Sequence, residues 1–231
     1  MGRQRTWWQA RRWRVALGVV LASLPVTAWG WWQAAHWAPD AAAFPVQGVV
    51  LGAADGAVDM RVLAATGARF AYLEASRGAG ARDPLFARNL ALGQAAGLRI
   101  GAIHRYDPCV PADMQAASFV TTVPRLPAML PPAVALVKTA EGCADPLAAT
   151  GLEGELTTFL NQIEHHTGSR ALLAIDPAFA AQHPQAADLG RKLWVTSDWW
   201  QPDQPWTLWT ANAAYRSEAS DAPLRWVVAQ P

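Results

Sequence analysis

Short apolar runs alternate with amphipathic stretches along most of this chain. Strand-like runs fall at eight places, which are residues 47–52, 70–76, 99–104, 134–138, 171–175, 193–196, 206–210 and 224–228. Between them, apolar residues recur at spacings of three and four over 59–66, 84–96, 112–123 and 151–167, and this pattern predicts helices. Strands that alternate with helices indicate parallel crossovers, so the pattern predicts an α/β fold.

Eight strands in this arrangement predict a single irregular TIM-like (β/α) barrel over residues 46–231. Asp83 and Pro84 supply an N-cap and a proline at the first helical position, and Gly97 ends the same helix. The last part of the chain, from about residue 190, carries little helical pattern. We therefore expect loops between the last strands.

The first 45 residues have a different character. Five arginines lie between Arg3 and Arg14, and the stretch from Val15 to Trp32 that follows has no charge. That stretch has about the length needed to cross a bilayer. We expect a basic cytoplasmic segment at 1–14, a transmembrane helix or signal anchor at 15–37 and a linker at 38–45. Positive-inside reasoning then puts the barrel outside the cytoplasm.

Two interpretations of this segment stay open. Tryptophans flank it on both sides, as in the aromatic belt of a retained anchor, at positions 7, 8, 13, 29, 31, 32 and 37. Small residues at Val26-Thr27-Ala28 also fit a cleaved signal peptide. The first interpretation predicts a single-pass inner-membrane protein with its barrel in the periplasm, and the second a secreted protein.

Charge and cysteine content narrow the classes of function. The chain has 19 basic and 18 acidic residues, a formal net charge of +1, which gives no electrostatic case for nucleic acid as a partner. The two cysteines form no cluster with histidines at metal-ligand spacing, so we expect no metal and no cofactor.

Cys109 and Cys143 each follow a predicted strand, in loops that a barrel would hold on one face. In an oxidising compartment we expect them to form a disulfide. Closing a loop of about 35 residues stabilises a fold by about 3 to 4 kcal/mol in the chain-entropy model. The alternative is two unrelated buried thiols.

Several segments form a series in a fixed order: VQGVV at 46–50, FAYLEAS at 70–76, AAGLRIGAIH at 95–104 and PWTLW at 205–209. In this order they resemble the family 25 glycoside hydrolases, exported lysozymes that cut the bond between muramic acid and glucosamine in peptidoglycan. The resemblance covers about four-fifths of the chain. It implies a lysozyme-like barrel with peptidoglycan as partner, and exported members carry cysteines where Cys109 and Cys143 stand.

The acidic positions of the family are nearly all changed in this chain. The family's opening strand ends in an aspartate, and the matching residue is Val50. The fourth strand ends in Asp-x-Glu, which aligns with Leu136 and Lys138. An aspartate of the last strand aligns with Arg225, and a glutamate after the second strand with Arg77.

These changes remove the groups that the family's reaction needs. Glycoside hydrolysis uses one carboxylic acid to protonate the leaving oxygen and a second carboxylate to stabilise an oxocarbenium-like centre. Valine and leucine can do neither, and the positive charge of Lys138 opposes the cation of the transition state. We therefore expect an exported, membrane-tethered lysozyme-like barrel that has lost muramidase activity and binds peptidoglycan or an envelope protein.

Two other functions remain possible. One is an active N-acetylmuramidase with relocated carboxylates, for which Glu74, Glu141 and Asp176 are the candidates near strand ends. The other is a protein-interaction scaffold of the cell envelope, because a fold does not fix a function. Glu74 and Lys138 could also form an ion pair that closes the barrel, or lie apart as solvated residues.

The candidates for ligand binding are residues that the resemblance or their type places near the cleft. His104 is the one polar cleft residue that the chain shares with the family, although it could equally be a buried structural histidine. Tryptophans can stack on sugar rings, although core packing explains some of them as well. The full set of binding candidates is His104, Arg77, Trp199, Trp200 and Trp209.

Overall fold

The computed structural model describes Trp13, Leu17 and residues 23–143 and 151–231. The chain divides into two compact units, residues 1–37 and 38–231. In the first unit residues 23–35 are helical. The transmembrane helix expected over 15–37 is not found among the described residues, where no helix is both long and apolar enough to cross a bilayer. Residues 15, 16 and 18–22 of the expected span lie outside the described residues.

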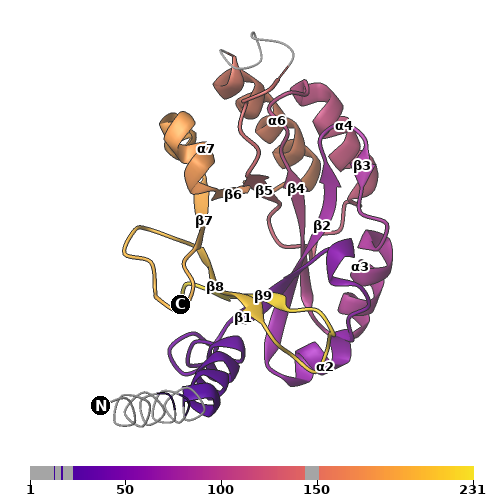
Figure 1. Ribbon diagram of the computed structural model, residues 1–231. Coiled ribbons are helices and arrows are strands. Elements are labelled where there is room, and N and C mark those ends of the chain that lie inside the picture. The colour runs from indigo at the N-terminus through magenta and orange to yellow at the C-terminus, as the bar shows by residue number, and fades with distance from the viewer. Residues whose placement is uncertain (1–12, 14–16, 18–22, 144–150) are drawn as a thin grey trace, which may run out of the picture. The chain divides into compact units, whose positions relative to one another are not determined.

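The second unit is a closed barrel of eight strands (Figure 1). The sheet runs in the order β1-β9-β8-β7-β6-β5-β4-β2, and pairing of β1 with β2 closes it. A two-residue strand, β3 (Ala81–Arg82), pairs with the end of β2. The barrel strands are β1 (Gln47–Leu51), β2 (Ala68–Arg77), β4 (Arg99–Arg105), β5 (Ala133–Leu136), β6 (Leu172–Ile175), β7 (Lys192–Thr196), β8 (Leu208–Tyr215) and β9 (Leu224–Ala229).

Strand direction corrects the expected TIM-like barrel. Neighbouring strands from β1 through β2 and β4 to β8 are parallel, but β9 is antiparallel to both β8 and β1. Only residues 216–223 connect β8 to β9. A parallel return needs a crossover of about a dozen residues or more, so this short connection forces an antiparallel strand. The fold is a mixed α/β fold with a closed eight-stranded β-barrel.

The helices lie outside the barrel (Figure 1). The four predicted helices are present, and the expected loops join β7 to β8 and β8 to β9. A further helix, α7, follows β6; Asp176 caps it and Pro177 is its first residue. The helices are α2 (Met60–Ala65), α3 (Phe86–Ala95), α4 (Ala112–Thr122), α6 (Leu152–Thr167) and α7 (Pro177–Gln182), with short 3-10 turns η1 (Ala53–Asp55) and η2 (Pro184–Asp188).

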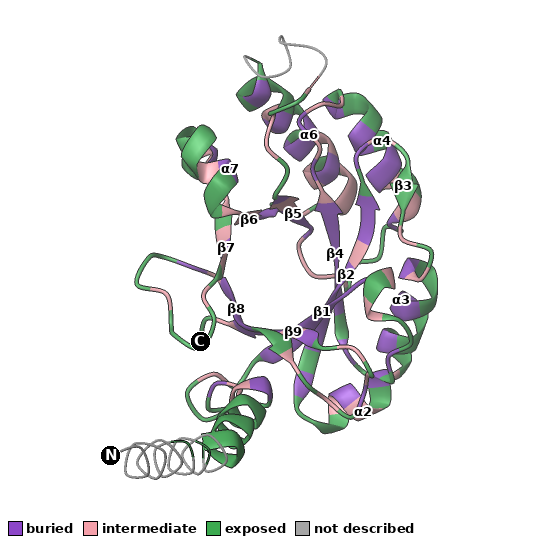
Figure 2. Ribbon diagram, in the orientation of Figure 1, coloured by how far each residue is buried: buried purple, intermediate pink, exposed green. Residues whose placement is uncertain are grey.

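Side chains on the strands alternate between two apolar layers, and most strand residues are buried (Figure 2). Those on the outer side pack under the helices; His104 of β4, for example, contacts Phe119 of α4 and Phe159 of α6. The inward side chains form one cluster: Val50, Phe70, Tyr72, Ile103, Ala133, Leu172, Trp194, Leu208 and Val227. A residue's place in this alternation therefore decides whether it can reach the open end of the barrel.

Candidate functional site

The carboxyl ends of the parallel strands form one end of the barrel, which we call the mouth, and catalytic residues of such barrels lie at this end. Three charged side chains meet there. Glu74 Oε1 accepts hydrogen bonds from Arg225 Nη2 of β9 at 3.0 Å and from Arg105 Nη1 of β4 at 3.3 Å. The Glu74 side chain is 18% exposed and the two arginines about one third. We call these residues the mouth cluster.

Glu74 lies across the end of β1. A Cβ atom added at Gly52 would stand 3.1 Å from the Glu74 carboxyl carbon. Two further carboxylates bind the backbone here: Asp55 Oδ2 accepts from the Gly52 amide at 2.7 Å and Asp83 Oδ2 from the Ala53 amide at 2.6 Å. Burial raises the pKa of Asp55, although the Gly52 hydrogen bond and the positive charge of Arg225 act in the opposite direction.

Asp55 and Arg105 were not predicted as site residues from the sequence, and Asp83 was predicted only as a helix cap. Asp83 does act as a cap, because its Oδ1 accepts from the Leu85 amide at 2.8 Å. Asp55 is the last residue of η1, the short turn that follows β1, and Arg105 is the last residue of β4. Their position at or soon after the carboxyl end of a buried strand was the available signal.

Replacing Glu74 by glutamine is expected to lower the free energy of unfolding by about 1 to 2 kcal/mol. The change leaves Arg105 and Arg225 without their carboxylate, which is costly for a buried pair. The roughly one-third exposure of both arginines lets water screen part of this cost. Urea unfolding at neutral pH measures the difference.

Glu141→Gln is the matched control, because Glu141 is exposed and accepts a hydrogen bond from a neutral side chain, Gln182. We expect a change within about 0.5 kcal/mol for this variant. A double-mutant cycle of Glu74→Gln with Arg225→Met measures the interaction free energy between these two side chains. Equal effects of Glu74→Gln and Glu141→Gln would contradict a stabilising role for the mouth cluster.

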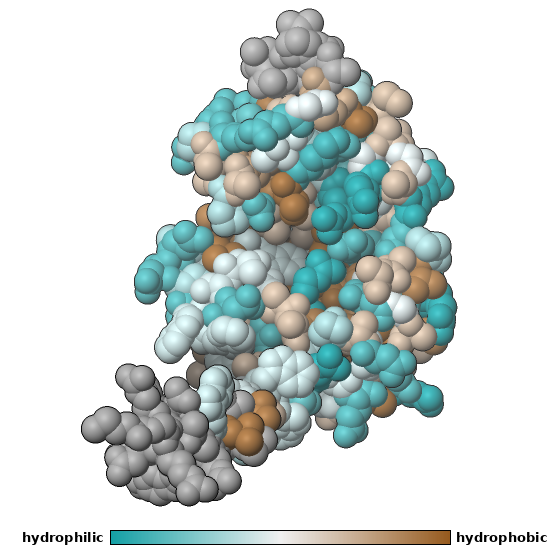
Figure 3. All heavy atoms as spheres, viewed as in Figure 1, coloured by the Kyte–Doolittle hydropathy of each residue, from teal (hydrophilic) through white to brown (hydrophobic). Residues whose placement is uncertain are grey.

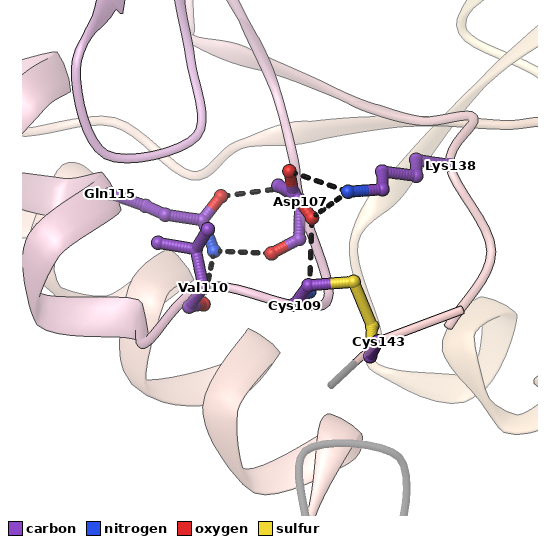
Figure 4. Close-up of a disulfide and its surroundings, with 6 residues drawn as sticks. All are labelled: Asp107, Cys109, Val110, Gln115, Lys138 and Cys143. Carbon is purple, nitrogen blue, oxygen red and sulfur yellow. Dashed lines mark hydrogen bonds and ion pairs between the residues drawn. A yellow bond between two sulfur atoms is a disulfide. The ribbon is translucent and has the colours of Figure 1, made fainter. Parts of the chain in front are cut away.

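Lys138 has a different partner from the one the sequence suggested. Its Nζ lies 2.7 and 2.8 Å from the two carboxylate oxygens of Asp107, so of the two alternatives the ion pair with Glu74 does not form (Figure 4). Asp107 follows β4, and Lys138 follows β5. The contact therefore ties together two neighbouring loops of the mouth.

The same two loops are joined covalently. Cys109 and Cys143 form the predicted disulfide, with their Cα atoms 5.0 Å apart (Figure 4). Asp107 Oδ1 also accepts from the Cys109 amide at 3.0 Å. Gln115 of α4 donates to the carbonyl oxygens of Asp107 and Val110 at 2.9 and 2.8 Å. The loop after β4 is thus fixed from both sides.

His104 does not face the mouth, which corrects its assignment as a binding residue. It is 0% exposed and lies on the outer side of β4. Its Nδ1 lies 2.9 Å from Ser76 Oγ and its Nε2 3.2 Å from Gln115 Oε1. A register shift in the pairing of β2 with β4, between Glu74 and Ser76, accompanies the pairing of Ser76 with His104. Burial lowers the His104 pKa to about 4.

Comparison with known proteins gives the family. The sequence pattern described as glycosyl hydrolases family 25 matches residues 51–220. The chain belongs to glycosyl hydrolase family 25. The family 25 glycosyl hydrolase of Bacillus anthracis has the same fold, with a TM-score of 0.75 and 21% identity over 85% of this chain and 93% of that one. The lysozyme of Streptomyces coelicolor has a TM-score of 0.69 and 20% identity over 80% of this chain and 92% of that one.

A protein of Escherichia coli K12, the uncharacterised YegX, is 26% identical over 162 residues. The match covers 68% of this chain and 57% of YegX, so the chain spans little more than half the length of this relative. At identities near 20%, the likeness to the solved structures shows the fold alone.

The side-chain directions show where the residues that the resemblance aligned with the family's acids lie in the barrel. Val50 belongs to the inward cluster and pairs with Arg225 of β9. The Arg225 side chain lies at the mouth, where it donates a hydrogen bond to Glu74. The resemblance places Leu136 and Lys138 at the Asp-x-Glu positions. Leu136 is fully buried outside the inward cluster, to which Ala133 and Ala135 contribute.

Alternation along β5 indicates which of its residues face the interior. Ala133 belongs to the inward cluster and Ala135 packs against it, so Val137 and Thr139 follow on the same face. None of these four side chains carries a carboxylate.

The other proposed carboxylates do not gather with Glu74. Asp176 caps α7 by accepting from the Ala178 amide at 2.8 Å, and Glu141 accepts from Gln182 Nε2 of the same helix at 2.7 Å. Asp176 follows β6, which β4 and β5 separate from β2 in the sheet order. Both carboxylates therefore belong to the side of the mouth near α7.

The remaining binding candidates divide into buried and exposed residues. Trp209 is 2% exposed, donates to the Ser197 carbonyl oxygen at 2.7 Å and packs beside Trp206, so core packing explains it. Trp199 and Trp200, between β7 and β8, are 49% and 75% exposed, and Arg77 is exposed at the end of β2. In the described part of the chain no three His, Cys, Asp or Glu side chains group as metal ligands.

Proposed function

We propose that this protein is an exported family 25 member that binds peptidoglycan and no longer hydrolyses it. The observation that carries the proposal is the composition of the mouth. Val50 of β1 and Ala135 of β5 face the interior and carry no acid, and Glu74 is held by Arg105 and Arg225. A pair of free carboxyl groups about 5 to 10 Å apart is what glycoside hydrolysis requires.

The charges of the mouth cluster also act against the reaction. An oxocarbenium-like transition state develops positive charge. Two neighbouring guanidinium groups would therefore raise the energy of this transition state. Loss of general acid catalysis alone lowers the reaction rate about 10²- to 10⁴-fold.

Binding is supported by exposed side chains near the mouth. The indole faces of Trp199 and Trp200 are available to stack on sugar rings, and Arg77 can pair with the carboxylates of muramic acid or the peptide stems. Hydrophobic residues (brown) are scattered in small groups over the face seen in Figure 3, where no large apolar patch suggests a protein partner. The disulfide supports an oxidising compartment, such as the periplasm, where peptidoglycan lies.

The test combines co-sedimentation with purified peptidoglycan and release of reducing ends. We expect the protein to sediment with the glycan and to release no more reducing ends than a blank. Replacing Trp199 and Trp200 by alanine should lower the bound fraction at least severalfold. Met114→Ala, which removes another exposed apolar side chain on α4, is the control. A wild-type protein that stays in the supernatant would refute glycan binding and favour the envelope scaffold.

Hydrolysis by other carboxylates is the second candidate, and one observation favours it. Asp55 is half-buried with a raised pKa, and Glu74 and Asp83 are close enough to contribute to that shift. Neighbouring carboxylates in different environments are how glycosidases divide acid and base roles. Wild-type release of reducing ends that Asp55→Asn abolishes would establish this reaction and overturn the first proposal.

A further inference from the structure

A cavity opens at the end of the barrel opposite the mouth. Its lining includes the first residues of four parallel strands, which are Arg99 of β4, Leu172 of β6, Lys192 of β7 and Leu208 of β8. Ala229, the last residue of the antiparallel β9, lies at the same end. The cavity has a volume of about 560 Å³, within the range of small-molecule sites.

The inner surface of this cavity is apolar. Phe70, Tyr72, Leu172 and Leu208 line it, and all four belong to the inward cluster. The Tyr72 ring lies flat over Gly101, where any side chain would collide with it. The Tyr72 hydroxyl donates to the Pro131 carbonyl oxygen at 3.0 Å, so its polar atom is already satisfied. Small barrels ordinarily fill their interior with side chains, whereas this end is left open.

The rim of the cavity is strongly basic. Its cations are Arg69, Arg99, Arg170, Arg191 and Lys192, and its lining contains no aspartate or glutamate. Arg191 is engaged, because its Nε and Nη2 lie 3.0 Å from the two carboxylate oxygens of Glu164. The other four are exposed, and within the described residues none of them forms an ion pair.

We propose that this cavity binds a single-chain amphiphile with an anionic head group. The apolar tail enters the barrel against Tyr72 and Leu208, and a carboxylate or phosphate head meets Arg99 and Arg170 at the rim. Guanidinium groups that form no ion pair with a carboxylate bind anionic head groups through paired, charge-assisted hydrogen bonds. The apolar lining discriminates against small inorganic anions, which would leave it unfilled. The site lies at the opposite end of the barrel from the mouth, so it does not depend on the proposed glycan binding.

Isothermal titration of the full chain with decanoate, decyl phosphate and decanol tests the proposal. We expect saturable binding of at least one anion, at one molecule per chain, and binding of decanol at least tenfold weaker. The tighter of the two anions identifies the head group. Equal affinity for decanol and both anions, or binding of inorganic phosphate as tight as decyl phosphate, would overturn the proposal.

Variants locate the site. Arg99→Gln and Arg170→Gln each should weaken anion binding about tenfold, the loss of one charge-assisted contact. Ala229→Trp should fill the cavity and abolish binding. Arg88→Gln, an equal charge change on exposed α3, is the matched control. Rim variants that bind like Arg88→Gln would refute the site, as would a folded Ala229→Trp that still binds. Glycan co-sedimentation of Ala229→Trp should equal that of the wild type.

Discussion

Replacing both Cys109 and Cys143 by alanine is expected to lower the free energy of unfolding by about 3 to 4 kcal/mol. The disulfide closes a loop with a sequence separation of 34, and the chain-entropy model gives this magnitude for such a loop. For a domain of this size the loss corresponds to a fall in Tm of about 10 °C. Urea unfolding of the double variant and of the wild type at pH 7.5 measures the difference.

Two comparisons separate the disulfide from other contacts of the same loops. Adding reductant should destabilise the wild type to about the level of the double variant and leave that variant unchanged. Lys138→Met removes the ion pair with Asp107 between these loops, but Lys138 is half exposed, so we expect a loss of no more than about 1 kcal/mol. A reduced wild type as stable as the oxidised one would contradict a stabilising role for the disulfide.

The alternation of apolar and polar residues was sufficient to predict where most strands and helices lie. It could not predict the direction of β9, which follows from the short connection over residues 216–223. It also missed α7, although Asp176 and Pro177 form the same N-cap and proline signal that marked an earlier helix. That helix is too short for its apolar spacing to stand out.

The side-chain directions in β5 show why residues of this strand are hard to place from the sequence alone. Val134, Ala135, Leu136 and Val137 are all apolar, because a parallel strand is covered on both faces. Such a run contains no polar alternation to fix its register. A slip of one residue exchanges the two faces, so an alignment can exchange Leu136 with its inward neighbour Ala135.

Charge partners were the least predictable part of the site. Glu74 pairs with arginines 31 and 151 positions away in the sequence, on strands that only the closed barrel brings together. Lys138 follows β5, the strand beside β4, and its partner Asp107 lies in the loop that the disulfide also holds. The sequence left open whether Glu74 and Lys138 are paired or lie apart, and the topology of the closed barrel decides their partners.

The Ser76-His104-Gln115 network is complete with a neutral imidazole. Gln115 Nε2 donates to two backbone carbonyl oxygens, so its Oε1 accepts the hydrogen of His104 Nε2. His104 Nδ1 then accepts from the Ser76 hydroxyl. Burial is the largest cause of the lowered pKa, because the charged imidazolium has no access to water there, and the hydrogen bond to Gln115 opposes it.

The fold is therefore expected to lose stability when the pH falls below about 6.5. Between pH 6.5 and about 4 the unfolded chain binds a proton at His104 and the folded chain does not. Stability from this group is complete above pH 6.5 and falls by about 1.4 kcal/mol for each pH unit below it. The total loss reaches about 3 kcal/mol near pH 4.

Urea unfolding between pH 4.5 and 8 of the wild type and of His104→Gln measures this effect. The carboxyl groups titrate in both proteins, so the difference between the two curves isolates the histidine. We expect the advantage of the wild type to shrink by about 1.4 kcal/mol per pH unit on acidification below pH 6.5. His165→Gln, at an exposed position, controls for the loss of a histidine as such. Parallel curves for wild type and His104→Gln would mean that His104 does not couple protonation to folding.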